Sequence, residues 1–190
     1  MTKDQLRGLY LDKRRKLTPA VCSEYSNILY NFFFTSFDLS VLKVVHTFIP
    51  LEKNNEPDTW IIIDRIKREF PHIKISIPRI GSDGNLENFY FEGIQQLKEN
   101  TWGILEPIQG IPTPSEQIDL VLVPLLTFDV DGQRIGYGKG YYDRFLQMCR
   151  RDCKKVGLSF FDPTSLLIDA NNYDVSLDSC ITPARVINFS

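Results

Sequence analysis

Residues 118–145 read IDLVLVPLLTFDVDGQRIGYGKGYYDRF, and this stretch decides the predicted fold. Its first part, Ile118–Pro124, is apolar after Asp119 and ends at a proline, which predicts a buried strand. A glycine-rich turn comes next, and a helix follows it. The apolar face of that helix carries Tyr142, Phe145, Leu146 and Cys149. Because ligands of open α/β sheets bind beyond the carboxyl ends of the strands, we expect a binding site at this turn.

The turn combines backbone freedom with positive charge. Gly136, Gly138 and Gly140 alternate with larger residues, so the backbone can turn tightly and approach a ligand closely. Free N–H groups that run into a helix N-terminus bind phosphate, and Arg134 and Lys139 add two positive charges. The segment therefore predicts a phosphate site. The alternative is a turn whose glycines serve only its geometry.

Neither of two well-known phosphate loops matches this turn. A P-loop has a glycine five residues before its Gly-Lys pair and Ser or Thr after it, whereas Gln133 and Gly140 stand at these positions. The dinucleotide fingerprint is G-x-G-x-x-G, and this segment reads G-x-G-x-G. Asp143, in the first turn of the helix, is placed where it could hold a phosphate-bound Mg²⁺.

Upstream, the pattern predicts two helices. Apolar residues recur at three- and four-residue steps within residues 1–17, and Lys3, Arg7 and Arg14 fall together on one edge of that helix. Thr18-Pro19 reads as an N-cap followed by proline at the first helical position, which begins a second helix that runs to about Phe33.

Strands and helices alternate in the rest of the chain. Val41–Ile49, Pro57–Phe70 and Ile73–Ile77 read as strand, helix and strand, which indicates a right-handed βαβ unit and a parallel sheet. The further predicted strands are Asn88–Phe91, Val156–Phe160 and Arg185–Phe189. There is no repeat or linker, so we expect residues 1–190 to form one α/β domain.

Composition excludes several classes of protein. The chain has 190 residues, 22 Lys and Arg against 24 Asp and Glu, and a net charge of −2, which argues against a general nucleic-acid binder. No apolar run approaches the length of a membrane-spanning helix, which needs about 18 residues. The N-terminus is charged and lacks the apolar core of a secretory signal peptide. We therefore expect no membrane partner and a cytoplasmic location.

Cysteines and histidines do not suggest a metal centre. The four cysteines are Cys22, Cys149, Cys153 and Cys180. They form no C-x-x-C pair, and Cys149 and Cys153 are predicted one turn apart on a helix. The two histidines, His46 in a predicted strand and His72 after a proline, lie far apart in sequence. We expect reduced thiols, a core position for His46 and no zinc site.

The sequence resembles the 5-formyltetrahydrofolate cyclo-ligase family, whose members are also called 5,10-methenyltetrahydrofolate synthetases. The main resemblance comprises Asp119–Pro124, Phe128-Asp129, Gly132 and Arg134–Asp143. Further matches, in the order that the family shows, are Lys3-x-x-Leu6-Arg7, Phe48-Ile49-Pro50 with Glu56, Ile77-Pro78-Arg79, and Trp102-Gly103-Ile104 with Glu106-Pro107. One departure is Leu125-Leu126, where the family commonly places small residues, and it leaves the shape of the turn open.

The resemblance implies a fold and a reaction. The implied fold is a single-domain, Rossmann-like, open and mostly parallel sheet with helices on both faces. In the implied reaction, 5-formyltetrahydrofolate and MgATP bind, and the formyl oxygen attacks the γ-phosphate. N10 of the folate then displaces phosphate to close the methenyl ring, so that ADP and phosphate are released. Such chemistry needs positioning and charge neutralisation and no catalytic histidine or cysteine.

The same resemblance implies the roles of individual residues. Lys3 and Arg7 would meet the ATP phosphates, and Arg134, Lys139 and Tyr141 would act in catalysis. The residues that would wrap the nucleotide are Arg134, Ile135, Gly136, Tyr137, Gly138, Lys139, Gly140, Tyr141, Tyr142 and Asp143. The residues that would border the folate are Ile49, Glu56, Tyr137, Gly138, Lys139, Gly140 and Tyr141. Glu56 would accept two N–H bonds from the amino-pyrimidine edge, and Asp143 and Asp174 would hold Mg²⁺.

Structural alternatives exist for several of these residues. Lys3 and Arg7 could form a solvated helix edge, and Glu56 lies in the polar stretch Glu52–Asp58, which could be a surface loop. An Asx-turn would explain Asp174 equally well. Two other functions compete with the cyclo-ligase: a non-catalytic nucleotide- or folate-binding relative, and another small-molecule phosphotransferase on the same scaffold. For the cyclo-ligase we expect a monomer whose partners are the small molecules 5-formyltetrahydrofolate and ATP.

Overall fold

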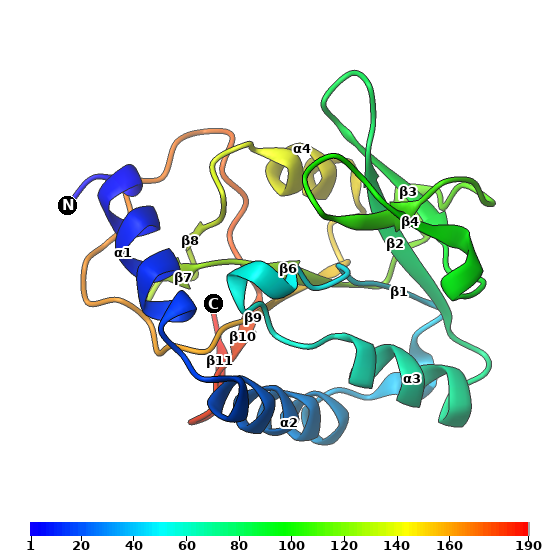
Figure 1. Ribbon diagram of the computed structural model, residues 1–190, viewed down its shortest axis with the longest axis horizontal. Helices are drawn as coiled ribbons and strands as arrows, with labels where there is room; N and C mark the ends of the chain where they lie inside the picture. The colour runs from blue at the N-terminus through cyan, green and yellow to red at the C-terminus, as the bar shows by residue number, and fades with distance from the viewer. Residues whose placement is uncertain (190) are drawn as a thin grey trace.

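A seven-stranded sheet forms the centre of the computed structural model, which describes residues 1–189 (Figure 1). Its strands are β1 (Val44–His46), β2 (Lys74–Ile80), β3 (Leu86–Tyr90), β6 (Leu120–Pro124), β9 (Lys154–Leu158), β10 (Ser179–Ile181) and β11 (Val186–Asn188). They lie in the order β11-β10-β9-β6-β1-β2-β3. The inner strands are parallel, and β3 and β11 run antiparallel at the two edges. This open, mostly parallel sheet confirms the predicted fold class.

The strand order creates a position for a ligand. The parallel strands follow the order β2-β1-β6-β9-β10, so the chain leaves β1 toward one side for β2 and later continues on the other side with β6. Such an order has a topological switch point between β1 and β6, beyond whose carboxyl ends ligands bind. The fold therefore brings the residues after β1 and those after β6 together.

Helices cover both faces of the sheet. The α-helices are α1 (Lys3–Arg15), which lies beside the sheet, and α2 (Pro19–Ser36), α3 (Trp60–Glu69) and α4 (Tyr141–Met148), which cover its faces. Figure 1 shows α2 and α3 on one side of the sheet and α4 on the other. Thr18 caps α2 through the backbone N–H of Val21, with Pro19 at the first helical position, as predicted.

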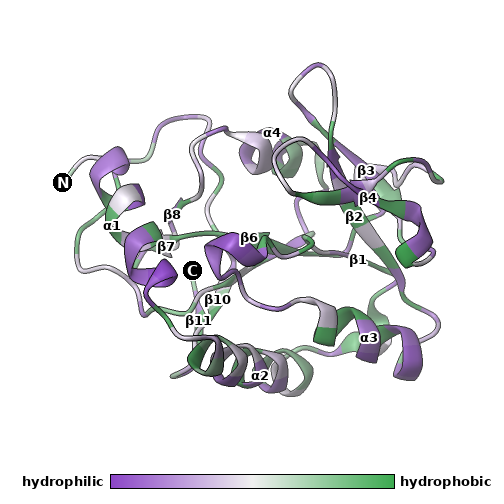
Figure 2. Ribbon diagram, viewed as in Figure 1, coloured by the Kyte–Doolittle hydropathy of each residue, from purple (hydrophilic) through white to green (hydrophobic). Residues whose placement is uncertain are grey.

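Strand β6 shows why its sequence is apolar throughout. Leu120 and Leu122 pack in the core that lies under α2 and α3, whereas Val121 and Val123 pack in the core under α4. A strand that is buried on both faces has no polar alternation. In Figure 2 the interior strands are hydrophobic and α1, at the edge of the molecule, is largely hydrophilic.

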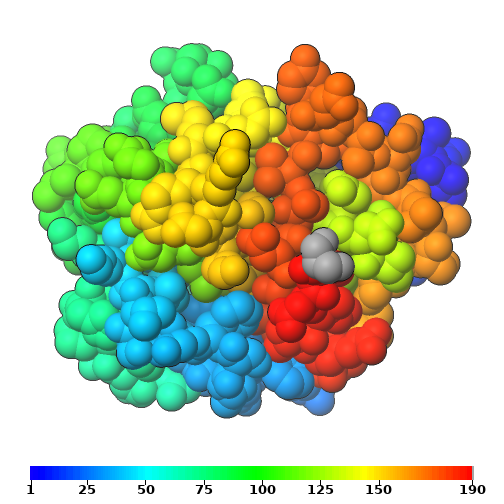
Figure 3. Space-filling model, turned by 180° about the vertical axis from the view of Figure 1, so that it is seen from behind, coloured from blue at the N-terminus to red at the C-terminus, as the bar shows by residue number. Residues whose placement is uncertain are grey.

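Helix α1 packs on the segments that follow β6 and β9. Leu6 and Tyr10 form a small core with Leu126, Ile135 and Ile168. In Figure 3, seen from behind, the region around residues 160–175 (orange) lies beside α1 (dark blue). Within residues 1–189, no helix has the length and apolar character that crossing a membrane requires.

Several predicted boundaries are wrong, and three of the differences matter for the site or for the cysteines. The strand over Val41–Ile49 is only Val44–His46, because Val41 ends a short 3-10 turn and the chain leaves the sheet after His46 at the switch point. The helix predicted from Pro57 begins at Trp60. Helix α4 ends at Met148, so Cys149 and Cys153 do not share a helix.

Several short elements escaped prediction because two or three residues leave no detectable period. They are the hairpins β4 (Leu97–Glu99) with β5 (Leu105–Pro107) and β7 (Thr127–Phe128) with β8 (Arg134–Ile135), the strand β10, and the 3-10 turns η1 (Leu39–Val41), η2 (Glu52–Asn54), η3 (Ile94–Gln96) and η4 (Ser115–Gln117). The β7–β8 hairpin stands between β6 and the glycine-rich turn, which therefore does not follow the strand directly.

Candidate functional site

Two cavities adjoin at the switch point. The first has a volume of about 560 Å³ and the second about 460 Å³. The glycine-rich turn and the start of α4 form the wall between them. The residues that line both cavities are Pro124, Tyr137, Lys139, Tyr141 and Tyr142. A molecule in one cavity can therefore lie next to a molecule in the other.

The predicted site residues are distributed between the cavities as follows. The predicted nucleotide residues Lys3, Arg7, Arg134, Ile135, Gly136, Tyr137, Gly138, Lys139, Gly140, Tyr141, Tyr142 and Asp143 all line the first cavity, and so does Asp174. Of the predicted folate residues, Ile49, Glu56, Tyr137, Lys139 and Tyr141 line the second cavity. Gly138 and Gly140 line only the first.

The glycine-rich turn is shaped by two glycines with left-handed backbones. Gly138 has φ +84° and Gly140, the N-cap of α4, has φ +67°. A Cβ at Gly138 would lie 2.8 Å from Cζ of Arg7, and Nε of Arg7 donates to the carbonyl of Gly136 at 3.0 Å. The Arg7 guanidinium thus packs directly on the turn, which excludes the alternative of a freely solvated side chain.

Arg144 is a site residue that the sequence did not reveal. Its guanidinium donates to the carbonyl of Lys139 at 3.1 Å, to the carbonyl of Gly84 at 2.7 Å and to Oδ1 of Asn85 at 2.8 Å. It therefore ties the glycine-rich turn to the tip of the β2–β3 hairpin. An arginine on the exposed face of a helix gives no sequence signal for such a role.

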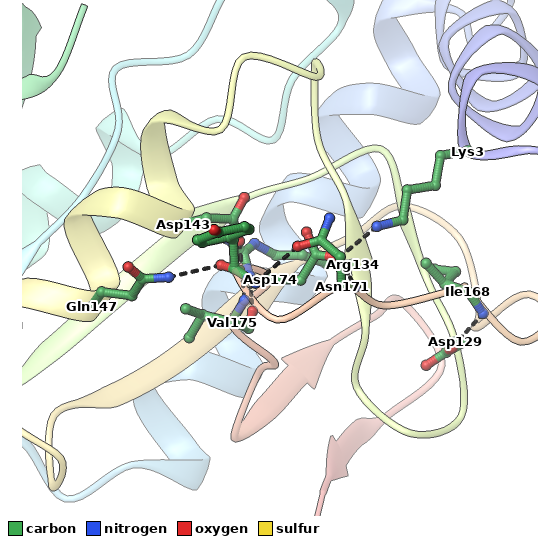
Figure 4. A network of polar contacts seen from close by, with 10 residues as sticks. Lys3, Asp129, Arg134, Asp143, Gln147, Ile168, Asn171, Asp174 and Val175 are labelled. Atoms are coloured by element: carbon green, nitrogen blue, oxygen red, sulfur yellow. Dashed lines mark hydrogen bonds and ion pairs between the residues drawn. The ribbon is translucent and has the colours of Figure 1, made fainter.

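A polar network closes one end of the first cavity (Figure 4). Arg134, whose side chain is 5% exposed, donates to Oδ1 of Asp143 at 2.8 Å and to the carbonyl of Val175. Nζ of Lys3 contacts Oδ2 of Asp174 at 2.5 Å. The network joins α1, β8, α4 and the loop before β10, which are far apart in the sequence.

The two carboxylates of this network have the chemistry of a Mg²⁺ site. Within residues 1–189, the contacts of Asp143 are made by Oδ1 and those of Asp174 by Oδ2, so each keeps a second oxygen for a ligand. Burial tends to raise the pKa of Asp174, but the bonds from Lys3 and the Asn171 backbone outweigh it and the pKa lies below its ordinary value.

Protein groups alone would not hold a metal ion here. In the described part of the chain, no three His, Cys, Asp or Glu side chains are grouped as metal ligands. Mg²⁺ commonly binds through one or two carboxylates together with substrate phosphates. The pair Asp143 and Asp174 fits that mode, in which phosphate oxygens complete the coordination.

Lys139 differs from the other cations of the first cavity. Lys3, Arg7 and Arg134 each contact an aspartate, and Arg144 donates to two backbone carbonyls and to Asn85. Within residues 1–189, the exposed ammonium of Lys139 has no hydrogen bond or ion pair, and it lies where the two cavities meet. It is therefore the cation that is most available to an incoming anion.

The second cavity is an apolar slot with a carboxylate in its wall. Phe48, Ile49, Pro78, Ile80, Leu86 and Ile104 supply apolar lining. The Glu56 side chain is 6% exposed, so the surface-loop alternative is wrong. Oε1 of Glu56 accepts from the Tyr137 hydroxyl at 2.5 Å, and Oε2 accepts from the backbone N–H of Leu51 at 2.7 Å.

Burial governs the ionisation of Glu56. It raises the pKa of this carboxyl, and the Arg14 charge and the bonds from Tyr137 and Leu51 lower it by less. The pKa of Glu56 is therefore above its ordinary value. Arg14, predicted on a common edge with Lys3 and Arg7, differs from them in being buried.

Other predicted residues have structural roles. Leu125 and Leu126 are buried in two different cores, so their bulk points away from both cavities. His46 is buried against Asn88, and burial lowers its pKa to about 3, which leaves it neutral. Trp102, one of the residues that carry the family resemblance, is 58% exposed at the rim of the second cavity.

Comparison with known proteins gives consistent matches. The model of the 5-formyltetrahydrofolate cyclo-ligase family matches residues 1–183. The 5-formyltetrahydrofolate cyclo-ligase of Escherichia coli (strain K12) is 27% identical over 177 residues, 92% of this chain and 96% of that protein. That of Mus musculus is 31% identical over 144 residues, 69% of this chain and 70% of that protein.

Solved structures show the same architecture. The 5,10-methenyltetrahydrofolate synthetase of Mycoplasma pneumoniae is similar with a TM-score of 0.77 and 26% identity, over 95% of this chain and 98% of that chain. The Aquifex aeolicus 5,10-methenyltetrahydrofolate synthetase is similar with a TM-score of 0.78 and 24% identity, over 99% of this chain and 93% of that chain. The second likeness concerns the fold alone.

Proposed function

The chain belongs to the 5-formyltetrahydrofolate cyclo-ligase family, and its activity is the ring closure of 5-formyltetrahydrofolate to 5,10-methenyltetrahydrofolate; from this premise we propose that the reaction consumes ATP where the two cavities meet. The nucleotide occupies the first cavity and the folate occupies the second. The observation that carries the proposal is the shared wall, because Tyr137, Lys139 and Tyr141 border both cavities.

The residues of the first cavity suit the triphosphate of ATP. Lys3, Arg7 and Lys139 supply positive charge, and the glycine-rich turn leads into the N-terminus of α4, which favours anions. We assign the γ-phosphate to the end of the cavity next to Lys139. Asp143 and Asp174 would hold Mg²⁺, which when bound to the phosphates neutralises part of their charge.

The residues of the second cavity suit a pterin. Its apolar walls accept a flat ring, and Glu56 can accept N–H bonds from the amino-pyrimidine edge. Glu56 contacts Tyr137 of the shared wall, so a pterin bound at Glu56 lies beside that wall. The two substrates then meet at Tyr137–Tyr141, on which Arg144 holds the backbone in one arrangement.

The chemistry proceeds in two steps. The formyl oxygen forms a bond to the γ-phosphorus while the bond from that phosphorus to the β-bridging oxygen of ATP breaks. N10 then bonds to the formyl carbon, the carbon–oxygen bond to phosphate breaks, and N10 loses its proton. Lys139 and Arg134 stabilise the charge on the transferring group, and the site supplies positioning and electrostatics without a side-chain nucleophile.

The alternatives identified from the sequence have less support. A non-catalytic relative is expected to lack charged groups of the first cavity, whereas Arg134, Lys139 and Asp143 are all present in it. A phosphotransferase acting on another small molecule does not need a buried carboxylate in an apolar slot. We propose that the single domain acts as a monomer on small molecules; the cytoplasmic location stays a prediction.

The direct test is an absorbance assay of the purified protein with 5-formyltetrahydrofolate, ATP and Mg²⁺, in which the conjugated methenyl product is followed at mildly acidic pH. We expect product only when all three components are present. Binding of both substrates without product would favour the non-catalytic relative, and the absence of binding would refute both assignments.

Replacement of Glu56 by glutamine is expected to weaken folate binding by about 10- to 100-fold, because hydrogen bonds to a charged acceptor contribute about 1.5–3 kcal/mol. Calorimetric titration with 5-formyltetrahydrofolate measures the loss, and titration with ATP should give the wild-type affinity. Glu52→Gln is the matched control, since Glu52 is exposed in the same segment. Equal folate affinity in the two variants would exclude the assignment of Glu56.

A further inference from the structure

Arg14 is a buried cation at the end of α1 whose guanidinium joins three separate segments. Nε donates to the carbonyl of Asn54 at 2.7 Å, and Nη1 donates to the carbonyl of Leu125 at 3.0 Å. Nη2 donates to the hydroxyl of Tyr137. These partners lie after β1, after β6 and in the glycine-rich turn, so one side chain connects the three pieces of chain that build the site.

The same guanidinium faces the carboxylate of the second cavity. Nη2 of Arg14 lies 3.8 Å from Oε1 of Glu56, and both groups contact the Tyr137 hydroxyl. That hydroxyl accepts from Arg14 and donates to Glu56. The order Arg14, Tyr137, Glu56 is therefore a continuous chain of polar contacts from α1 to the wall of the folate slot.

Stability alone does not account for a buried arginine at this position. Desolvation of a buried ion pair costs as much as its attraction returns, and apolar residues of similar volume are often equally stable. Arg14 is instead placed where its loss would release both Tyr137 and Glu56. Helix α1 also presents Lys3 and Arg7 to the first cavity. The same helix therefore contacts residues of both cavities, and Arg14 makes its contact with the second.

We propose that Arg14 is a positioning residue for the folate substrate, which holds the Glu56 carboxylate and the Tyr137 hydroxyl in the arrangement that receives the pterin. This inference rests on the proposed function and deepens it. Arg14 itself does not touch the substrate, since it lines neither cavity.

The charges around Glu56 indicate how the proposal can be detected. The ionisable groups that face its carboxylate or share its cavity are Arg14, Lys53, Arg79, Glu106, Tyr137, Lys139, Tyr141 and Tyr142. Among them, Arg14 is the cation that opposes the effect of burial on the pKa of Glu56. Without Arg14, this pKa rises further above its ordinary value, so the carboxylate forms only at higher pH.

The decisive experiment compares Arg14→Met with Arg15→Met. Arg15 lies next to Arg14 and also fastens α1 to residue 54, because its Nη2 donates to Oδ1 of Asn54 at 2.8 Å. It does not contact Glu56 or Tyr137. A role limited to holding the helix is shared by the two arginines, whereas the proposed role belongs to Arg14 alone.

We expect Arg14→Met to raise the KM for 5-formyltetrahydrofolate by about 100-fold, since small misplacements of a binding group have effects of this size. The KM for ATP should change by less than about 3-fold, which is well below the effect expected for the folate. The profile of kcat/KM for the folate should lose activity on the acid side at a higher pH than in the wild type. Arg15→Met should resemble the wild type in all three.

Arg14→Lys separates charge from geometry and serves if Arg14→Met does not fold. One ammonium cannot reach all three acceptors, so the KM for the folate should rise by about 10-fold, a smaller misplacement. The retained charge should keep the acid side of the pH profile near its wild-type position. Glu56→Gln in the same background should remove this acid-side dependence, because its amide does not titrate.

Each outcome decides one of the two ideas. If the wild type makes no methenyl product, the proposed function fails and Arg14 has no role in it. If the wild type is active and the Arg14 variants change the folate KM and the pH profile no more than Arg15→Met does, the positioning role is refuted and the cyclo-ligase function stands. A larger rise in the KM for the folate than in the KM for ATP, together with the shifted acid side of the pH profile, supports both the cyclo-ligase function and the positioning role of Arg14.

Discussion

Replacement of Lys139 by alanine is expected to lower kcat by about 1000-fold, the effect typical of losing a group that stabilises developing charge. Lys139 lies where the cavities meet, and its ammonium has no polar partner within residues 1–189. Its removal therefore leaves no buried group unpaired, and the free energy of unfolding should change by less than about 0.5 kcal/mol. Steady-state kinetics and urea unfolding measure the two quantities.

Two further variants make this result specific. Lys139→Arg keeps the charge and should retain more activity than alanine. Lys154→Ala removes an exposed lysine from β9, outside both cavities, and should leave kcat unchanged. Wild-type turnover by Lys139→Ala would refute the assignment of the γ-phosphate to this end of the first cavity.

The Gly138→Val protein is expected to lose at least as much activity as Lys139→Ala and also to be less stable than the wild type. Gly138 has φ +84°, which a β-branched residue does not adopt without strain of about 1–3 kcal/mol. The new side chain would also displace the Arg7 guanidinium, whose Cζ lies 2.8 Å from the Cβ position. Both the turn and a predicted phosphate contact would change. Urea unfolding and the methenyl assay should show the two losses together.

Gly136→Ala is the matched control for the unfolding measurement. A Cβ at Gly136 meets no atom within 4 Å, and its φ is not in the left-handed region. Its free energy of unfolding should therefore equal that of the wild type or be higher by up to about 1 kcal/mol, since alanine restricts the unfolded chain. Equal losses of stability in Gly138→Val and Gly136→Ala would exclude the backbone of Gly138 as the cause.

The features that the sequence predicted correctly depend on neighbouring residues. The N-cap Thr18 with Pro19 and the glycines before α4 act through hydrogen bonds and backbone angles within a few positions. Their physics is local, so their patterns can be read along the chain. The position of the site followed from them, because a strand that leads into a glycine-rich turn and a helix places a ligand at its carboxyl end.

Local patterns also misled where the tertiary structure decided the outcome. The β-branched character of Val41–Ile49 favours a strand, but the chain must leave the sheet at the switch point and only Val44–His46 pairs. The hairpins β4–β5 and β7–β8 pair strands of only two or three residues, which are too short to show a period in the sequence. A polar stretch such as Glu52–Asp58 reads as surface, although Glu56 is buried.

By itself, the sequence determined the fold class, the candidate phosphate turn and the residues on it. The tertiary structure alone decided the contacts and the burial of each basic residue of α1. Three residues of α1 with the same chemistry have different surroundings. Arg7 packs on Gly138, Arg14 is buried beside Glu56, and Arg15 is exposed. The reason is physical: helix periodicity sets the direction of a side chain, whereas its burial and its partners depend on the distant segments that folding places opposite it.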